Sequence, residues 1–284
     1  MILVIGGTGK VGLEAVKQLA QKRALARVLV RSAQKAQEIE DLGLETIRGD
    51  LTNIAGIKAA LKGVEKVFLL TPPSPNEAEL KSTLVDAAIK AGVTHLVLLS
   101  GAGAAHDSAI SQAQQHAKAD DHLKASGLAF TILQPYFFMQ NFLNQTAAIK
   151  SQGAIYGNYK NRKLAMVDTR DIAAVASACL TESGHDGRTY VISGGEAIAH
   201  AEIAEKLSAI RGKKINYVDL SSEQLMKGLT GLGYPEWLAS DLTMLGEDIA
   251  EGHFAHITDV VAKVAKKKPI TFEQFARDNA QAFS

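Results

Sequence analysis

The sequence predicts an α/β fold built on a doubly wound parallel sheet. Short, almost continuously apolar segments alternate with segments of helical hydrophobic spacing through the first half of the chain. Continuous apolar strands are typical of a parallel sheet covered on both faces, and right-handed crossovers make such a sheet doubly wound. A glycine-rich turn directly follows the first strand. The length of 284 residues suits one large α/β domain with a smaller domain beside it.

The expected strands and helices alternate in order along the chain. Six strands are expected, in MILVIG, ARVLVRS, LETIRGD, KVFLLTPP, HLVLLSGAG and LAFTILQP. The helices between them are expected in LEAVKQLAQK, SAQKAQEIEDLG, residues 53–62, EAELKSTLVDAAIKAG and residues 112–126. Ser32 is the expected N-cap of the second helix, and Gly43 its end.

The larger domain is expected to be discontinuous in sequence. It comprises residues 1–134, after which the alternation loosens. Residues 166–194 return to it through a helix at 170–182 and a strand at 188–193.

The smaller domain is expected to be mostly helical and to comprise residues 135–165 and 195–284. A helix at 200–211 and a strand in INYVDL are expected there. The shorter helices that follow are expected to be broken by Gly228, Gly231, Gly233 and Pro235.

Charge and hydropathy exclude several classes of protein. The net charge of +1 provides no bulk field for nucleic acid or an anionic membrane, and Lys266–Lys268 is interpreted as a solvated helix end. No apolar run reaches the roughly 18 residues that a membrane span needs, and the chain opens directly with a strand. We therefore expect a cytoplasmic protein, a monomer or homodimer, that binds neither nucleic acid nor membrane.

Cysteine and histidine usage gives no metal site. Cys179 is the only cysteine and lies in an apolar stretch, which indicates a buried, inert thiol. His253 and His256 have helical spacing but no evident third ligand, so no metal is expected.

The turn after the first strand reads GGTGKVG, with glycines at 6, 7, 9 and 12. Glycine allows a positive φ and lets a phosphate approach the backbone, and the following helix presents free N–H groups to an anion. In this strand–turn–helix context the pattern indicates dinucleotide binding, the alternative being a purely structural turn. The expected contacts are Gly6, Thr8, Gly9, Lys10, Val11 and Gly12.

The second strand ends in Arg31, about 20 residues after the turn, where an acidic residue would favour NAD. An arginine instead pairs with phosphate, and Lys10 and Lys35 add positive charge. NADPH is therefore expected in preference to NADH. The alternative is that Arg31 ends the strand and points to solvent.

The other strand ends supply further expected cofactor contacts, because ligands of this fold bind at the carboxyl ends of the strands. These contacts are Asp50, Leu51, Leu70, Thr71, Pro72, Ser100, Gly101, Pro135, Tyr136 and Phe137.

Motifs along nearly the whole chain resemble the NmrA-like branch of the atypical short-chain dehydrogenase/reductase superfamily, close to its quinone and triphenylmethane reductase group. They are GGTGKVG, VLVRSAQKA, LLSGAG, GLAFTILQP, YFFMQNF, VDTRDIAAVA, GRTYVISG and PITFEQFARDN. The resemblance implies a Rossmann fold with a smaller substrate domain. The family includes both hydride-transferring reductases and regulators that sense the dinucleotide without turnover.

The Tyr-xxx-Lys pair of typical short-chain dehydrogenases is missing from the helix at 112–126. Tyr156 and Lys160 have the right spacing but lie after the sixth strand, so we interpret them as a coincidence. His116 stands near the position of a catalytic lysine in related benzylic ether reductases. Asp120, one turn later, is expected to orient the imidazole and raise its pKa, for a proton donor or a polar contact. The alternative is a His–Asp pair of structural value only.

A run of aromatic residues follows the sixth strand, where the nicotinamide is expected. Phe138, Phe142 and Trp237 are candidates for stacking a flat acceptor, although helical spacing allows only one of Phe138 and Phe142 into a pocket. In VDTRD, Asp168 or Thr169 is expected to cap a helix, and Arg170 and Asp171 to form a structural ion pair.

Two functions follow from these patterns. The first is an NADPH-dependent reductase that transfers hydride directly to a flat electron-poor acceptor, such as a quinone or a cationic dye. The alternative is an NAD(P)-binding redox sensor without turnover.

Overall fold

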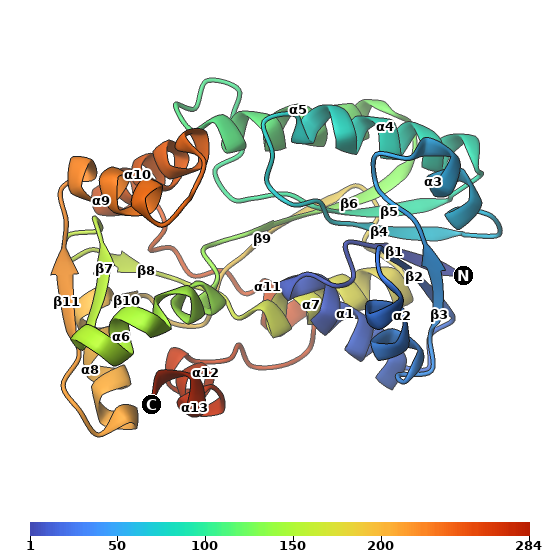
Figure 1. The fold of residues 1–284 in the computed structure, drawn as a ribbon. Helices are drawn as coiled ribbons and strands as arrows, with labels where there is room; N and C mark the ends of the chain where they lie inside the picture. The colour runs from blue at the N-terminus through green and yellow to red at the C-terminus, as the bar shows by residue number, and fades with distance from the viewer.

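A seven-stranded parallel sheet forms the centre of the computed structural model, which describes residues 1–284 (Figure 1). The strands lie in the order β3-β2-β1-β4-β5-β6-β9. Their bounds are β1 Ile2–Ile5, β2 Ala26–Val30, β3 Glu45–Arg48, β4 Lys66–Leu69, β5 His95–Leu99, β6 Ala129–Pro135 and β9 Arg188–Ile192. The chain reverses its direction of travel across the sheet between β1 and β4, which is where this fold opens a crevice for ligands.

Helices cover both faces of the sheet (Figure 1). One face carries α1 Lys10–Gln21, α2 Ala33–Glu40, α7 Thr169–Thr181 and α11 Val260–Val264; the other carries α3 Ile54–Ala60, α4 Glu77–Lys90 and α5 Ser111–Ala125. Successive residues of β1 alternate between the two cores: Val4 packs on the α1 side and Leu3 on the α4 side. Burial on both faces explains why these strands are apolar throughout.

The remaining elements gather at one end of the sheet, beyond the carboxyl ends of its strands (Figure 1). They are η1 Met139–Gln145, α6 Thr146–Gln152, β7 Ala154–Gly157, β8 Lys163–Leu164, β10 Ile198–Ala199, α8 His200–Arg211, β11 Asn216–Asp219, α9 Ser222–Gly231, α10 Glu236–Glu251, α12 Phe272–Asp278 and α13 Ala280–Phe283. β7 pairs with β11 in parallel, and β8 pairs with β10 in antiparallel. They enclose a third core that includes Phe142, Phe272 and Phe275.

The predicted fold class is confirmed, and so are the caps of two helices. Ser32 accepts a hydrogen bond from the amide of Lys35, and Asp168 accepts one from the amide of Arg170. Cys179 is fully buried, and burial raises the pKa of its thiol to about 12, as expected of an inert cysteine. No helix combines the length and apolar character that crossing a membrane requires.

Two local expectations are wrong. Gly228 and Gly231 lie within α9, and α10 is a single helix of 16 residues, so only Gly233 and Pro235 separate helices. The ion pair between Arg170 and Asp171 does not form.

The helical geometry explains the second error. Arg170 turns back to the N-cap Asp168 at 2.8 Å and reaches Asp278 at 2.6 Å. Asp171 points into the protein and pairs with Lys267 at 2.6 Å. Neighbouring residues of a helix face different directions, so adjacent charges rarely pair.

Candidate active site

The candidate site follows the carboxyl edge of the sheet, from the glycine turn after β1 to the aromatic segment after β6. Gly6 has a φ of +82°, and a Cβ there would stand 2.5 Å from the carbonyl oxygen of Leu70 on the neighbouring strand. A Cβ on Gly12 would overlap the carbonyl oxygen of Gly6. The tight turn and the close approach of α1 to β1 therefore both require glycine.

The beginning of α1 is open to an anionic ligand. Its N-cap is Gly9, which brings no side chain to the free amides of the first turn. Thr8, Gly9 and Lys10 are exposed, and Lys10 Nζ lies 3.5 Å from the carbonyl oxygen of Gln140 at the start of η1. Partial loss of water around its ammonium group lowers the pKa of Lys10. These features fit a pyrophosphate cradled by backbone N–H groups.

A polar hollow of about 470 Å³ lies at the ends of β2 and β3, and Arg31, Arg48, Gly49 and Asp50 line it. Arg48 was not among the residues predicted from the sequence. The pairing of Val30 with Arg48 brings it beside Arg31, and this register could not be read from either strand alone. Two exposed guanidinium groups at one hollow make a suitable site for a phosphate monoester.

Lys35 and Asp50, also predicted near this hollow, form hydrogen bonds or ion pairs with residues close to them in sequence. Lys35 pairs with Glu38 at 2.6 Å, within its own helix. Asp50 accepts hydrogen bonds from the amide and the hydroxyl of Thr52, which lower the pKa of its carboxyl. Leu51 is half-buried beside it.

A buried polar cluster lies behind the ends of β4 and β5. Lys81 and Glu77 of α4 form an ion pair at 2.6 Å, with both side chains at most 3% exposed. Lys81 also donates to the carbonyl oxygen of Leu99 at 2.8 Å and faces His116 Nδ1 at 3.4 Å. Glu77 accepts hydrogen bonds from Thr71 at 2.7 Å and from Gln112. His116 and Thr71 were expected from the sequence, whereas Lys81 and Glu77 were not, because their sequence pattern is that of surface residues on a helix.

The expected pairing of His116 with Asp120 is wrong. Asp120 Oδ2 accepts from the side-chain amide of Gln134 at 2.9 Å, and Lys81 occupies the partner position of His116. Burial and the charge of Lys81 lower the pKa of His116 to about 4, where a raised value was expected. Burial raises the pKa of Asp120. The imidazole is therefore neutral at physiological pH.

The imidazole of His116 lies over the end of β5. Its Nε2 atom is 3.0 Å from the place where a Cβ on Gly101 would stand. Ser100, the residue before, is buried. The imidazole of His116 can therefore pack against the end of β5 only because residue 101 is a glycine.

Aromatic side chains form the far wall of the site. Tyr136 packs edge-on against Phe254 with ring centroids 5.4 Å apart, and Phe137 against Tyr159 at 6.3 Å. Phe142 is fully buried between His200 and Phe272, so it belongs to the third core rather than to a pocket. Phe138 remains half-exposed, as the helical spacing allowed for one of the two.

The other predicted residues fall into three groups by exposure. Val11, Leu70, Pro135 and Tyr136 are buried; Trp237 on α10, Thr71 and Gly101 are half-buried; Pro72 is exposed. Phe254 was missed, because nothing in its local sequence connects the segment after α10 with β6. Tyr156 and Lys160 lie in β7 and in the turn after it, and not on α5, the helix that follows β5.

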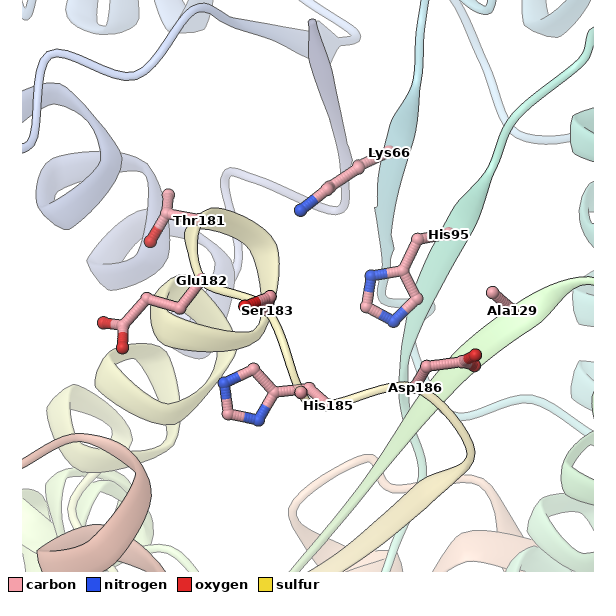
Figure 2. Close-up of a pocket in the computed structure, with 9 residues that line it drawn as sticks. Lys66, His95, Ala129, Thr181, Glu182, Ser183, His185 and Asp186 are labelled. Carbon is pink, nitrogen blue, oxygen red and sulfur yellow. The ribbon is translucent and has the colours of Figure 1, made fainter.

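Two other clusters lie apart from this edge. A hollow of about 680 Å³ lies at the opposite, amino edge of the sheet, lined by Lys66, His95 and the segment Thr181–Asp186 (Figure 2). Its lining is polar but internally paired: Lys66 donates to the carbonyl oxygen of Leu180 and His95 bonds Thr131. Although it is the larger hollow, it lies away from the strand ends where this fold binds ligands.

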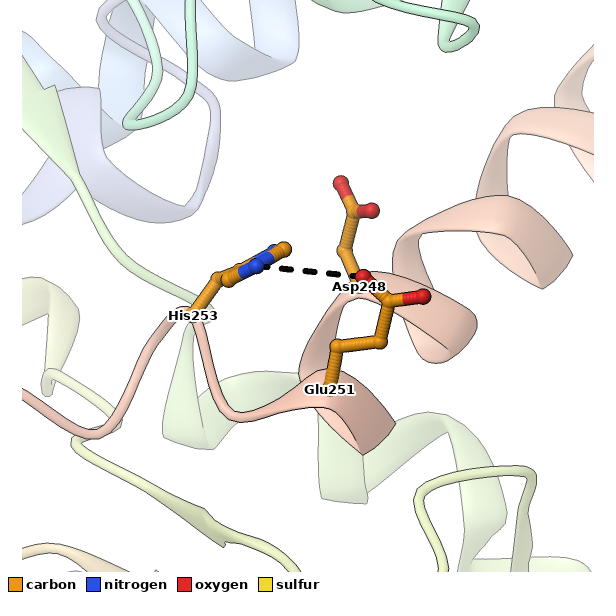
Figure 3. Close-up of side chains that lie close together, drawn as sticks. All are labelled: Asp248, Glu251 and His253. Carbon is orange, nitrogen blue, oxygen red and sulfur yellow. Dashed lines mark ion pairs between the residues drawn. The ribbon is translucent and has the colours of Figure 1, made fainter.

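The second cluster is Asp248, Glu251 and His253 at the end of α10 (Figure 3). Glu251 and His253 pair at 3.8 Å, and both are more than half exposed. Exposed acidic groups of this kind are common without a bound ion.

Comparison with known proteins places the chain in a family. The NmrA-like family matches residues 1–276, and the chain belongs to it. An NAD(P)H azoreductase of Xenophilus azovorans is 40% identical over 283 residues, covering 100% of this chain and 99% of the relative.

Two solved structures align over the same length. The NADPH complex of the Escherichia coli NADPH-dependent quinone oxidoreductase has a TM-score of 0.87 at 25% identity and covers 99% of both chains. The NADP(H) complex of the Citrobacter sp. triphenylmethane reductase has a TM-score of 0.86 at 26% identity, covering 99% of this chain and 100% of that one. The predicted family is therefore confirmed.

Proposed function

We propose that this protein is an NADPH-dependent reductase that transfers hydride directly to a flat, electron-poor acceptor, such as a quinone, an azo compound or a cationic dye. The observation that carries the proposal is the continuous row of ligand-binding features along one edge of the sheet. Along the sheet edge, the arginine pair is followed by the glycine turn, the His116 cluster and the aromatic wall, which is the order that an extended dinucleotide and an acceptor require. NAD(P)H-dependent oxidoreduction is also the activity named for the azoreductase relative.

The preference for NADPH is supported by Arg31 and Arg48. A ribose 2′-phosphate in their hollow receives charge-assisted hydrogen bonds from two planar guanidinium groups. NADH lacks this phosphate and leaves both groups solvated. The glycine turn serves both cofactors equally, so the discrimination belongs to the ends of β2 and β3.

The chain's own part in the reaction is to orient the cofactor and the acceptor and to shield them from water. Bound NADPH supplies a hydride at the nicotinamide C4 atom. Tyr136, Phe138 and Phe254 wall the space beyond β6 with apolar surface, which excludes water and stacks a planar acceptor. We infer that residues 135–165 and 195–284 form the acceptor-binding domain, with Trp237 at its rim.

Steady-state kinetics test this proposal. Purified protein is mixed with NADPH or NADH and a panel of quinones, azo dyes and cationic triphenylmethane dyes, and the loss of reduced nicotinamide absorbance is followed. We expect turnover well above the uncatalysed rate with at least one class, and a higher kcat/KM for NADPH. Equal turnover with NADPH and NADH would refute the proposed role of Arg31 and Arg48 in cofactor choice and would leave the reductase proposal standing.

The missing Tyr-xxx-Lys pair favours a second candidate, a redox sensor that binds NADP(H) without turnover. Tight NADPH binding by calorimetry, with no oxidation by any acceptor in the panel, supports the sensor and refutes the reductase. A protein partner is then sought by comparing complexes formed with NADPH and with NADP⁺.

A further inference from the structure

We propose that the Glu77–Lys81 ion pair is a positioning device that fixes His116 as a neutral hydrogen-bond donor, with its Nε2–H directed at the acceptor over Gly101. This inference rests on the proposed reductase function and assigns a task to three residues of α4 and α5. His116 is the catalytic residue in it, because it touches the acceptor. Lys81 and Glu77 act through His116.

The hydrogen bonds of Lys81 determine the tautomer of the imidazole. An ammonium group only donates, and its three partners are Glu77 Oε1, the carbonyl oxygen of Leu99 and His116 Nδ1. Nδ1 of His116 must therefore accept, and the single proton of the neutral ring is carried by Nε2. No other side chain bonds the imidazole, and Glu77 Oε1 lies 4.0 Å from Nδ1.

Glu77 holds Lys81 in this position. Its carboxylate accepts hydrogen bonds from Lys81 and Thr71 on Oε1 and from Gln112 on Oε2, and these donors on both oxygens fix its orientation. A charged pair that is nearly excluded from water is costly unless its hydrogen bonds are satisfied. Here every donor of Lys81 has a partner, and the cluster is anchored to β5 through Leu99.

The direction of Nε2 connects this cluster with the reaction. Cδ2 and Nε2 of His116 lie 2.9 and 3.0 Å from the place of an absent Cβ on Gly101, so the ring edge that carries Nε2 faces the carboxyl end of β5. Parallel α/β folds bind the reacting part of the ligand at this edge. A neutral N–H that is oriented before the reaction stabilises a developing negative charge without itself changing protonation.

The proton and electron balance of the step agrees with this role. Hydride adds two electrons and one hydrogen nucleus to the acceptor, which leaves one negative charge on a quinone oxygen or an azo nitrogen. The Nε2–H of His116 donates a hydrogen bond to that atom. Water then supplies the proton that completes the product, and the imidazole ends the step in its original state.

The first test measures the tautomer in the whole protein by ¹⁵N NMR of labelled histidine, with and without NADP⁺. The variant is the double substitution Glu77→Gln/Lys81→Met, which removes both charges together and leaves no buried charge unpaired. In the wild type we expect a neutral His116 with its proton on Nε2. In the double variant we expect a mixture of tautomers. A wild-type proton on Nδ1, or an unchanged tautomer in the variant, overturns the inference.

The second test measures kinetics with NADPH and the best quinone or azo acceptor, because these acceptors gain a negative charge when they take hydride. We expect His116→Ala and the double variant to lower kcat on the order of ten- to hundred-fold, with an unchanged KM for NADPH. His122→Ala, an exposed histidine of the same helix, is the matched control and should retain full activity. An unchanged kcat in both cluster variants, with native thermal unfolding, overturns the inference but leaves the reductase proposal intact. If the wild type has no turnover, the reductase proposal fails, and so does the part of the inference that assigns His116 a task toward an acceptor. The NMR result then decides the positioning of the imidazole.

Discussion

In the proposed reductase, Arg31 and Arg48 determine the choice between NADPH and NADH. Replacing Arg31 with Asp should lower the ratio of kcat/KM for NADPH over NADH by about ten-fold or more, because a charge-assisted phosphate contact is lost and a repulsion is added. Arg48→Ala should lower it less, since only attraction is removed. Arg188→Asp makes the same change of charge at the amino edge of the sheet and should leave the ratio unchanged. An unaltered ratio in both site variants would show that neither arginine meets the phosphate.

Gly12 supports the cofactor site through its lack of a side chain. A methyl group there overlaps the carbonyl oxygen of Gly6, so Gly12→Ala must displace either α1 or the turn. We expect NADPH affinity to fall at least ten-fold by calorimetry, alongside a lower melting temperature.

Gly228→Ala is the matched control for this substitution. Gly228 lies within α9 with open space around it. Alanine there should raise the free energy of unfolding by about 0.5–1 kcal/mol and leave binding unchanged. Equal NADPH affinity of the wild type and Gly12→Ala would show that the glycine turn does not bind the cofactor.

His200 makes stability depend on pH. Both of its ring nitrogens are buried without hydrogen-bond partners, and the ring stacks on Tyr159 with centroids 4.1 Å apart. Burial lowers the pKa of His200 to about 3 from an ordinary value of 6.5. The unfolded chain therefore binds the extra proton as pH falls below about 6.5, and stability is lost in that direction.

The expected loss from His200 alone is on the order of 2 kcal/mol at about pH 5. His200→Phe fits the aromatic surroundings and removes the titration, so its gain in unfolding free energy should be larger at pH 5 than at pH 8. Urea unfolding at the two pH values measures the difference, and His116 titrates alike in both proteins. A gain that is the same at both values would contradict the argument.

At the scale of elements, α5 depends on α10 for its N-cap. Its own N-cap residue, Ile110, has no capping side chain. Asp241 of α10 instead accepts hydrogen bonds from the amides of Ser111 and Gln112 at 2.9 and 2.8 Å. The helix that carries His116 is thereby fixed to the elements beyond the sheet.

Asp241→Ala should lower the free energy of unfolding by about 1–2 kcal/mol, measured by urea unfolding, because two amides lose their acceptor. The acceptor KM should also rise, since α5 and α10 are no longer held together. Asp248→Ala, on the same helix and without such contacts, is the control. Equal stability of the two variants would refute the role of Asp241 as a cap.

Much of the sheet could be predicted from the sequence, because apolar runs and helical spacing are local signals. Ser32 caps its helix as expected, and the six expected strands form within a few residues of the expected bounds. The partners of His116 could not be predicted this way. Lys81 precedes it by 35 residues, and only the packing of α4 against α5 brings the two together. The place of Arg48 depends on the register of β2 and β3, and that of Phe254 on the packing of a distant segment against Tyr136. Neither leaves a pattern in a single segment of the sequence.

At the scale of the whole molecule, the carboxyl edge of the sheet faces the elements that gather beyond it, among them η1, α9 and α10 (Figure 1). The sheet edge supplies the glycine turn and the arginine pair. The elements beyond it supply the aromatic wall with Phe254. In the proposed reductase, cofactor and acceptor would meet between these two groups of elements, where the chain would exclude water.

Transfer of labelled hydride tests the central claim most directly. The protein is mixed with NADPH that carries deuterium at both hydrogens of C4, together with a cationic triphenylmethane dye, whose reduced central carbon does not exchange with water. The account predicts one deuterium per reduced dye molecule by mass spectrometry, formed in step with NADPH oxidation. Reduced dye without deuterium, or bound NADPH that leaves this dye and every quinone and azo acceptor unchanged, would contradict direct hydride transfer by this protein.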